Sequence, residues 1–100
     1  MAIEHKYGTS VYTKEEVKNW IDAVEAVLGV KTGKIDNGKR QAIYLLPDGY
    51  SSVFVGLVPS YLGGAGLGTM VKFRGYPAIV TSIEAAKGLQ EAFKKAYENF

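Results

Sequence analysis

The chain has 100 residues, a length typical of one domain, and its 47% hydrophobic and 22% charged residues are sufficient for a buried core. This composition excludes intrinsic disorder, because the chain can bury enough apolar surface to offset the entropy lost on folding. The sequence has no cysteine, which excludes disulfides, zinc-thiolate sites and thiol nucleophiles. The net charge of +2 is unevenly spread: residues 1–29 carry −2, residues 30–80 carry +4, and residues 81–100 are neutral. The middle of the chain is therefore its basic part.

The first strong pattern is that of an amphipathic helix over residues 13–28. Apolar residues recur there at helical spacing, and charged residues occupy the opposite face. Thr13 and Glu16 have the spacing of a capping box, and Gly29 suits the left-handed residue that ends a helix. Before this helix, residues 3–7 are a weak candidate for a strand.

The middle of the chain predicts antiparallel strands. Residues 43–46 and 53–58 are joined by Pro47-Asp48-Gly49-Tyr50, a sequence typical of a tight turn, and together they predict a β-hairpin. A further turn, Asp36-Asn37-Gly38, separates a strand at 30–35 from the residues that follow, because Asn-Gly favours hairpin turns. We therefore expect a meander of three strands.

Residues 70–73 and 76–80 add one or two more strands, and Pro77 places the second of these at a sheet edge or at a strand start. Between the meander and these strands, the glycine-rich residues 59–69 are expected to form one long loop.

A second amphipathic helix begins at Thr81 or Ser82 and continues towards Phe100, with Thr81 and Glu84 at capping-box spacing. Residues 1–100 are thus expected to form a single α+β domain, a two-layer sandwich with an antiparallel sheet of three to five strands packed against two amphipathic helices. The expected order of elements is roughly β-α-β-β-β-β-α.

The apolar runs at 43–46 and 53–58 are nearly continuous instead of alternating, which predicts that both faces of the central strands are covered. Two helices can cover one face, so the other face needs a second copy or a partner, because large exposed apolar patches are rare on monomers. We therefore expect a homodimer that forms through the sheet. A strongly curled sheet that closes on itself is the structural alternative. The interface candidates are Tyr44, Leu46, Val53, Val55 and Leu57.

Two further features of the middle segment are candidate binding sites. Cations with nearby aromatic residues resemble a nucleic-acid surface, where cations meet phosphates and rings stack on bases. Four glycines at 63–68 could bring backbone amides close to a small anion such as a nucleotide or phosphate, although no helix start follows them. The candidates for ligand or nucleic-acid binding are Lys39, Arg40, Tyr61, Gly63, Gly64, Gly66, Gly68, Lys72, Arg74 and Tyr76.

The order helix, three strands, helix resembles that of double-stranded-RNA-binding domains. Those domains carry a lysine cluster at the start of the last helix, whereas this chain has Thr81-Ser82-Ile83-Glu84-Ala85-Ala86, with an acidic residue where a phosphate would dock. We therefore assign the chain to no family.

The sequence contains no pattern for catalysis or metal binding, and we expect neither an enzyme nor a cofactor. Its one histidine, His5, stands near the start of the chain, where single histidines are usually inert. Because no segment has the pattern of a signal peptide or a membrane span, a soluble cytoplasmic protein is expected. The favoured hypothesis is a non-enzymatic binding or accessory domain that self-associates through its sheet and engages a partner with its basic strands or glycine-rich segment. The alternatives are nucleic-acid binding by the sheet and anion binding by the glycines.

Overall fold

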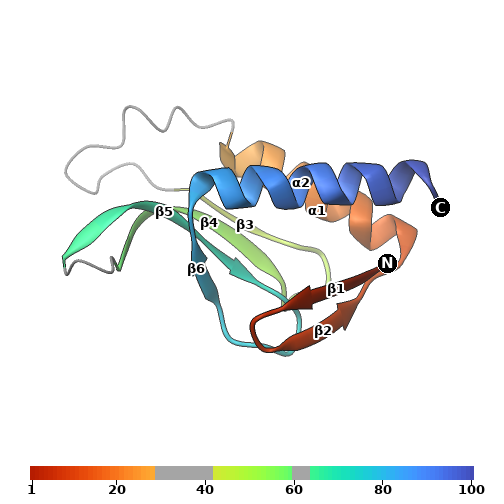
Figure 1. Ribbon diagram of the computed structural model, residues 1–100, viewed down its shortest axis with the longest axis horizontal. Coiled ribbons are helices and arrows are strands. Elements are labelled where there is room, and N and C mark those ends of the chain that lie inside the picture. The colour runs from red at the N-terminus through yellow and green to blue at the C-terminus, as the bar shows by residue number, and fades with distance from the viewer. Residues whose placement is uncertain (29–41, 60–63) are drawn as a thin grey trace.

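The computed structural model describes residues 1–28, 42–59 and 64–100 (Figure 1). Within them, the strands form two antiparallel sheets, a β1-β2 hairpin and a meander of order β3-β4-β5-β6. These elements confirm the expected α+β class and roughly the expected order. The elements are β1 (Ala2–His5), β2 (Gly8–Val11), α1 (Lys14–Leu28), β3 (Ala42–Leu45), β4 (Ser52–Pro59), β5 (Ala65–Lys72), β6 (Ile79–Thr81) and α2 (Ile83–Glu98).

Both helices lie side by side on the same face of the meander, with α1 against β3 and β4 and α2 against β5 (Figure 1). Trp20 of α1 stacks on Phe93 of α2 with the ring centroids 5.4 Å apart, and both side chains are fully buried. The core therefore lies between the helix layer and one face of the sheet. The most buried core side chains are Tyr12, Val17, Trp20, Ala23, Val24, Val27, Val53, Val55, Ala86 and Phe93.

The start of α1 is the predicted capping box. The Thr13 amide donates to Glu16 Oε1 at 3.0 Å, and the Glu16 amide donates to Thr13 Oγ1 at 3.2 Å. At α2 the cap is Ser82, whose hydroxyl accepts from the Ala85 amide at 3.0 Å. The capping box predicted from Thr81 and Glu84 is therefore placed one residue too early, because Thr81 is the last residue of β6.

The first eleven residues form a hairpin, where the sequence predicted a single weak strand. The register runs from Ala2 opposite Val11 to His5 opposite Gly8. The His5 ring stacks on Phe73 with the centroids 4.6 Å apart and forms an edge-to-face contact with Tyr76, with the centroids 4.7 Å apart. His5 is thus packed between aromatic rings, where it fixes the hairpin to the segment after β5.

The turn between β3 and β4 confirms the hairpin predicted at Pro47-Asp48-Gly49-Tyr50. Asp48 Oδ1 accepts from the amides of Tyr50 and Ser51, both at 2.8 Å. Gly49 has φ +78°, a left-handed conformation that few other residues adopt without strain. The predicted strand at 30–35 and the turn at 36–38 lie outside the described residues.

The expected long loop at 59–69 is wrong, because most of this segment belongs to strands. β4 and β5 remain paired from Ser52 opposite Lys72 as far as Pro59 opposite Ala65. Gly66 and Gly68 are therefore strand residues, and the β4-β5 hairpin extends past the start of α2 (Figure 1). β6 is the outermost strand and begins two residues after Pro77, in agreement with the placement predicted from that proline.

Candidate functional site

The face of the meander that the helices leave uncovered is apolar. Strand register aligns one residue from each strand on this face, because directly opposite residues point to the same side of a sheet. This row runs from Ile43 through Phe54 and Met70 to Val80. We call these four residues and Leu45, which lies two residues after Ile43 in β3, the open face.

Exposure of the open face is highest in the outer strands β3 and β6 and lower in the two central strands. Ile43 is 62% exposed, Leu45 72% and Val80 46%, whereas Phe54 and Met70 at the centre of the row are half-buried by their neighbours. A contiguous apolar surface of this kind is uncommon on a monomer and typically marks an interaction site.

The interface candidates taken from the sequence are mostly on the wrong face. Val53 and Val55 are fully buried and face the helices, as does the half-buried Tyr44, which lies opposite Val53. Leu46 is also buried. The sequence indicated a two-sided apolar strand, but it did not indicate which alternate residues the helices would cover.

Leu57 is on the same side of β4 as the core residues Val53 and Val55, but it lies on the part of β4 that extends past the helices. It is 44% exposed, as is Leu67, its partner in β5.

One signal in the sequence could have identified the open face. Lysine is almost never buried in an apolar core, so Lys72 marks the solvent side of its strand, and Met70, two residues before it, shares that side.

The basic candidates do not form a cluster in the described part of the chain. Lys39 and Arg40 lie outside the described residues. Lys72 lies on the same side as the open face, in a row with Ser52 and Leu45, and is half-buried. Arg74 points elsewhere, into a polar junction beside the start of α1. Of the four cations proposed to contact phosphates, only Lys72 is placed on the sheet face by the described residues.

Arg74 holds three segments together in this junction. Its Nη1 donates to Glu16 Oε2 at 2.5 Å and lies 3.8 Å from Asp48 Oδ2. Its Nη2 donates to the Val11 carbonyl at 3.1 Å. The guanidinium also lies over the Tyr12 ring, 5.1 Å from its centroid. These contacts engage Arg74 with the protein's own groups, which is a structural role rather than one in phosphate binding.

The carboxylates of the junction are stabilised in their charged form. Burial acts to raise the pKa of Glu16, but the Thr13 amide and the Arg74 guanidinium outweigh it and hold that pKa below its usual value. Burial likewise opposes ionisation of Asp48, but bonds from Ser51 and Tyr50 and the charge of Arg74 lower its pKa. Ser51 donates to Asp48 Oδ2 at 2.6 Å and is itself buried, so this serine–carboxylate pair is a turn-fixing contact and offers no accessible nucleophile.

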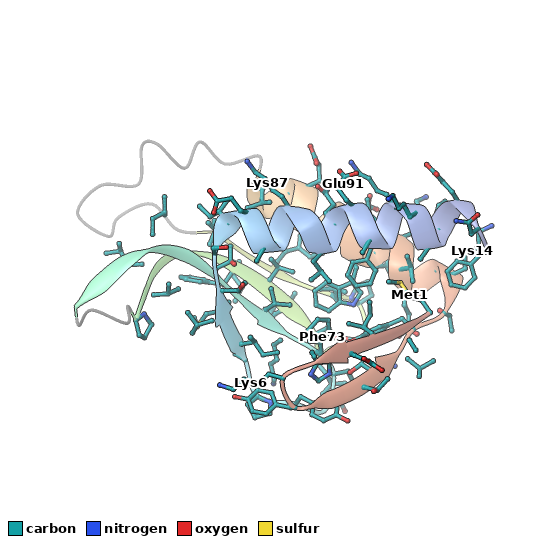
Figure 2. The ribbon with its side chains drawn as sticks, in the orientation of Figure 1. Met1, Lys6, Lys14, Phe73, Lys87 and Glu91 are labelled. Carbon is teal, nitrogen blue, oxygen red and sulfur yellow. The ribbon has the colours of Figure 1, made fainter. Side chains whose placement is uncertain are left out.

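The aromatic candidates are engaged in the same way. Tyr76 is half-buried against His5, and its hydroxyl donates to the Thr9 carbonyl at 3.3 Å. Phe73 is buried between His5 and Trp20. Figure 2 shows Phe73 in the interior between the β1-β2 hairpin and the helices. The buried Phe73 ring therefore presents no face on which a base could stack, and the half-buried Tyr76 ring is fixed by its own contacts.

The glycine candidates have separate roles. Tyr61 and Gly63 lie outside the described residues. Gly64 has φ +74°, so a left-handed residue stands just before β5. Gly66 and Gly68 are in the strand, and Gly68 is buried beneath the Val58 side chain. A cradle of converging amides is therefore absent from 64–68, the part of this segment that the structure describes.

A groove of about 210 Å³ lies between β1, β6 and the first turns of α2. Its lining is mainly apolar, from Val71, Ile79 and Leu89 among others, and His5 at its wall is already stacked on Phe73. Across residues 1–28, 42–59 and 64–100, no three His, Asp or Glu side chains are grouped as they would be around a metal ion. No described helix has the length and apolar character needed to cross a membrane.

Comparison with known proteins provides no relative for this chain. No family model, no curated protein and no solved structure matches it. Its function must therefore be inferred from its own residues, among which the open face is the most distinctive feature.

Proposed function

We propose that this protein is a non-enzymatic binding domain that self-associates through its open face. The observation that supports this proposal is the row of apolar residues across all four strands of the meander, on the side opposite the helices, which is exposed at both ends and half-buried at its centre. Burial of such a row is favourable by roughly 25 cal/mol per Å² of apolar surface removed from water.

A second copy is the occupant that fits this face best. In a two-fold contact the same patch meets itself, so an apolar row packs against an apolar row. On this side of the sheet the one charged residue within the described strands is Lys72, which lies in the neighbouring row beside Ser52. It can therefore remain in solvent at the rim while the apolar row is buried, as is usual for protein interfaces.

Analytical ultracentrifugation of the wild type and of Leu45→Lys tests this proposal. Leu45 is 72% exposed, so the substitution leaves the monomer fold intact but places a charge in the contact. Full burial of a leucine contributes about 1.5 to 3 kcal/mol, and a two-fold dimer contains Leu45 twice. Because Leu45 is already partly buried in the monomer, at least about 1 kcal/mol is lost per copy, and the dimer Kd should rise by roughly 30-fold or more.

Val11→Lys is the matched control. Val11 is an equally apolar strand residue, 65% exposed, but it lies in β2, away from the open face. This variant should associate like the wild type. A wild type that is monomeric up to concentrations of about 100 μM, or a Leu45→Lys variant that associates as tightly as Val11→Lys, would contradict the proposal.

Nucleic-acid binding by the sheet remains the alternative, and it is weaker because Arg74, Phe73 and Tyr76 are engaged within the protein. If it were correct, the affinity for an oligonucleotide would fall steeply with salt and would weaken on Lys72→Ala.

A further inference from the structure

The outer edge of β5 near its start has no neighbouring strand in the part of the chain that the structure describes. β6 pairs with β5 only from Thr69 opposite Thr81 to Val71 opposite Ile79. Beyond Thr81 the chain turns at Ser82 into α2, so β6 cannot continue along β5 towards Ala65. Figure 1 shows this end of β5 projecting past the start of α2.

Strand register determines which backbone groups point to this edge. The Leu46 amide donates to the Ser51 carbonyl at 2.9 Å, which makes these opposite residues a hydrogen-bonded pair. Because such pairs alternate along antiparallel strands, Val53 and Val55 bond towards β3, whereas Gly56 and Val58 bond towards β5.

The same alternation continues into β5. Gly66 and Gly68 are opposite Val58 and Gly56, so their amides and carbonyls point to β4. Leu67 lies between them, and its amide and carbonyl therefore point outward, away from β4. The described residues supply no partner for this outward amide and carbonyl.

Within the residues that the structure describes, this edge also lacks the features by which natural proteins prevent strand addition. Edge strands are usually protected by charged side chains, proline, a bulge or a covering element. Residues 53–71 contain no Asp, Glu, Lys, Arg or His, and residues 64–69 contain no proline. The edge is thus uncharged, and the described residues leave an amide and a carbonyl unpaired at Leu67.

We infer that the β5 edge around Leu67 pairs antiparallel with the same edge of a second copy. An uncharged edge is self-complementary in such a two-fold contact, because the outward amide of each copy meets an outward carbonyl of the other. This contact extends the sheet sideways and is separate from the contact through the open face. A chain with two different two-fold contacts assembles into more than two copies.

Variants that block each contact separately test the inference. Leu67→Pro removes the outward amide, and because that amide is not bonded to β4, the β4-β5 pairing persists. Leu67→Ala removes the side chain but keeps the amide and serves as the matched control. Both substitutions are made in the Leu45→Lys background, in which the open-face contact is blocked.

In that background, ultracentrifugation should show a residual dimer, which Leu67→Pro weakens by about tenfold or more and Leu67→Ala weakens much less. A Leu45→Lys variant that is already monomeric, or a dimer that Leu67→Pro leaves intact, overturns the edge contact without affecting the open-face proposal. If Leu45→Lys does not weaken association but Leu67→Pro does, the open-face proposal fails and the edge contact stands.

Amide hydrogen exchange provides a readout that does not require the proline variant to fold. In the Leu45→Lys protein, the exchange rate of the Leu67 amide should fall as protein concentration rises, because pairing protects it. The Gly66 amide, which points to β4, should show little dependence on concentration. Exchange of Leu67 at one rate across concentrations contradicts the inference.

Discussion

Gly68→Ala distinguishes a strand from a flexible anion-binding loop at the glycine-rich segment. A Cβ added at Gly68 would lie 2.6 Å from Val58 Cγ2 and 3.1 Å from the Thr81 carbonyl oxygen. Carbon atoms pack best at about 3.5 to 4.0 Å, so the two strands must separate by about 1 Å. Valine is stiff at χ1 and cannot easily turn away, and overpacking of this kind costs about 1 to 3 kcal/mol.

The matched control is Gly66→Ala, two residues away in the same strand and on the same side of the sheet. A Cβ at Gly66 meets nothing within 4 Å. The substitution should range from neutral to about 1 kcal/mol stabilising, because it restricts the unfolded chain.

Urea unfolding followed by tryptophan fluorescence measures both free energies. Trp20 is the only tryptophan and is fully buried, so its emission reports on the core. At one fixed protein concentration, Gly68→Ala should also lower Tm by about 4 to 8 °C per kcal/mol lost.

A double-mutant cycle identifies the contact responsible. In a Val58→Ala background the cost of Gly68→Ala should shrink, because the nearest clashing atom is gone. Equal stability of Gly68→Ala and Gly66→Ala would refute the placement of Gly68 beneath Val58, and the segment would again be a candidate for a flexible ligand-binding loop.

Two predictions concern the polar junction around Arg74. Arg74→Lys should lower the free energy of unfolding by about 0.5 to 1.5 kcal/mol, because an ammonium cannot bond Glu16 and the Val11 carbonyl together as the guanidinium does. Chemical denaturation measures this free energy, and an unchanged denaturation midpoint contradicts the prediction. Stability should also fall in acid. The folded pKa values of Glu16 and Asp48 lie below their usual 4.5 and 3.8, so their contribution is complete above those values and is lost as the pH falls through the lower folded ones. Glu16→Gln should flatten part of this decline in Tm measured from pH 6 to pH 2, and an identical decline in both proteins contradicts the assignment.

Local patterns in the sequence were sufficient for the elements that neighbouring residues specify. Thr13 and Glu16 satisfy each other's amides three residues apart, so their capping box needs no tertiary context. The Asp48 turn and the central hairpin are local in the same sense, because aspartate and glycine favour that backbone conformation by themselves.

Tertiary structure alone decided the roles of the candidate site residues. Arg74 is a basic strand-end residue in the sequence, and only folding places it beside Glu16, 58 positions away. His5 becomes part of an aromatic stack because the β1-β2 hairpin docks on Phe73. Such contacts between distant segments leave no periodic trace in a single sequence.

The nearly continuous apolar run in β4 indicated that its strand has cover on both sides, and no residue of β4 on the open-face side is classed as exposed. The sequence could not determine which alternate residues lie on that side, because a shift of one position moves every side chain to the other face. That choice depends on where the helices pack, which placed Val53 and Val55 in the core and left Ile43 and Leu45 exposed. The glycines of β5 are likewise compatible with a loop or a strand in the sequence alone, and only their pairing with β4 shows that they belong to a strand.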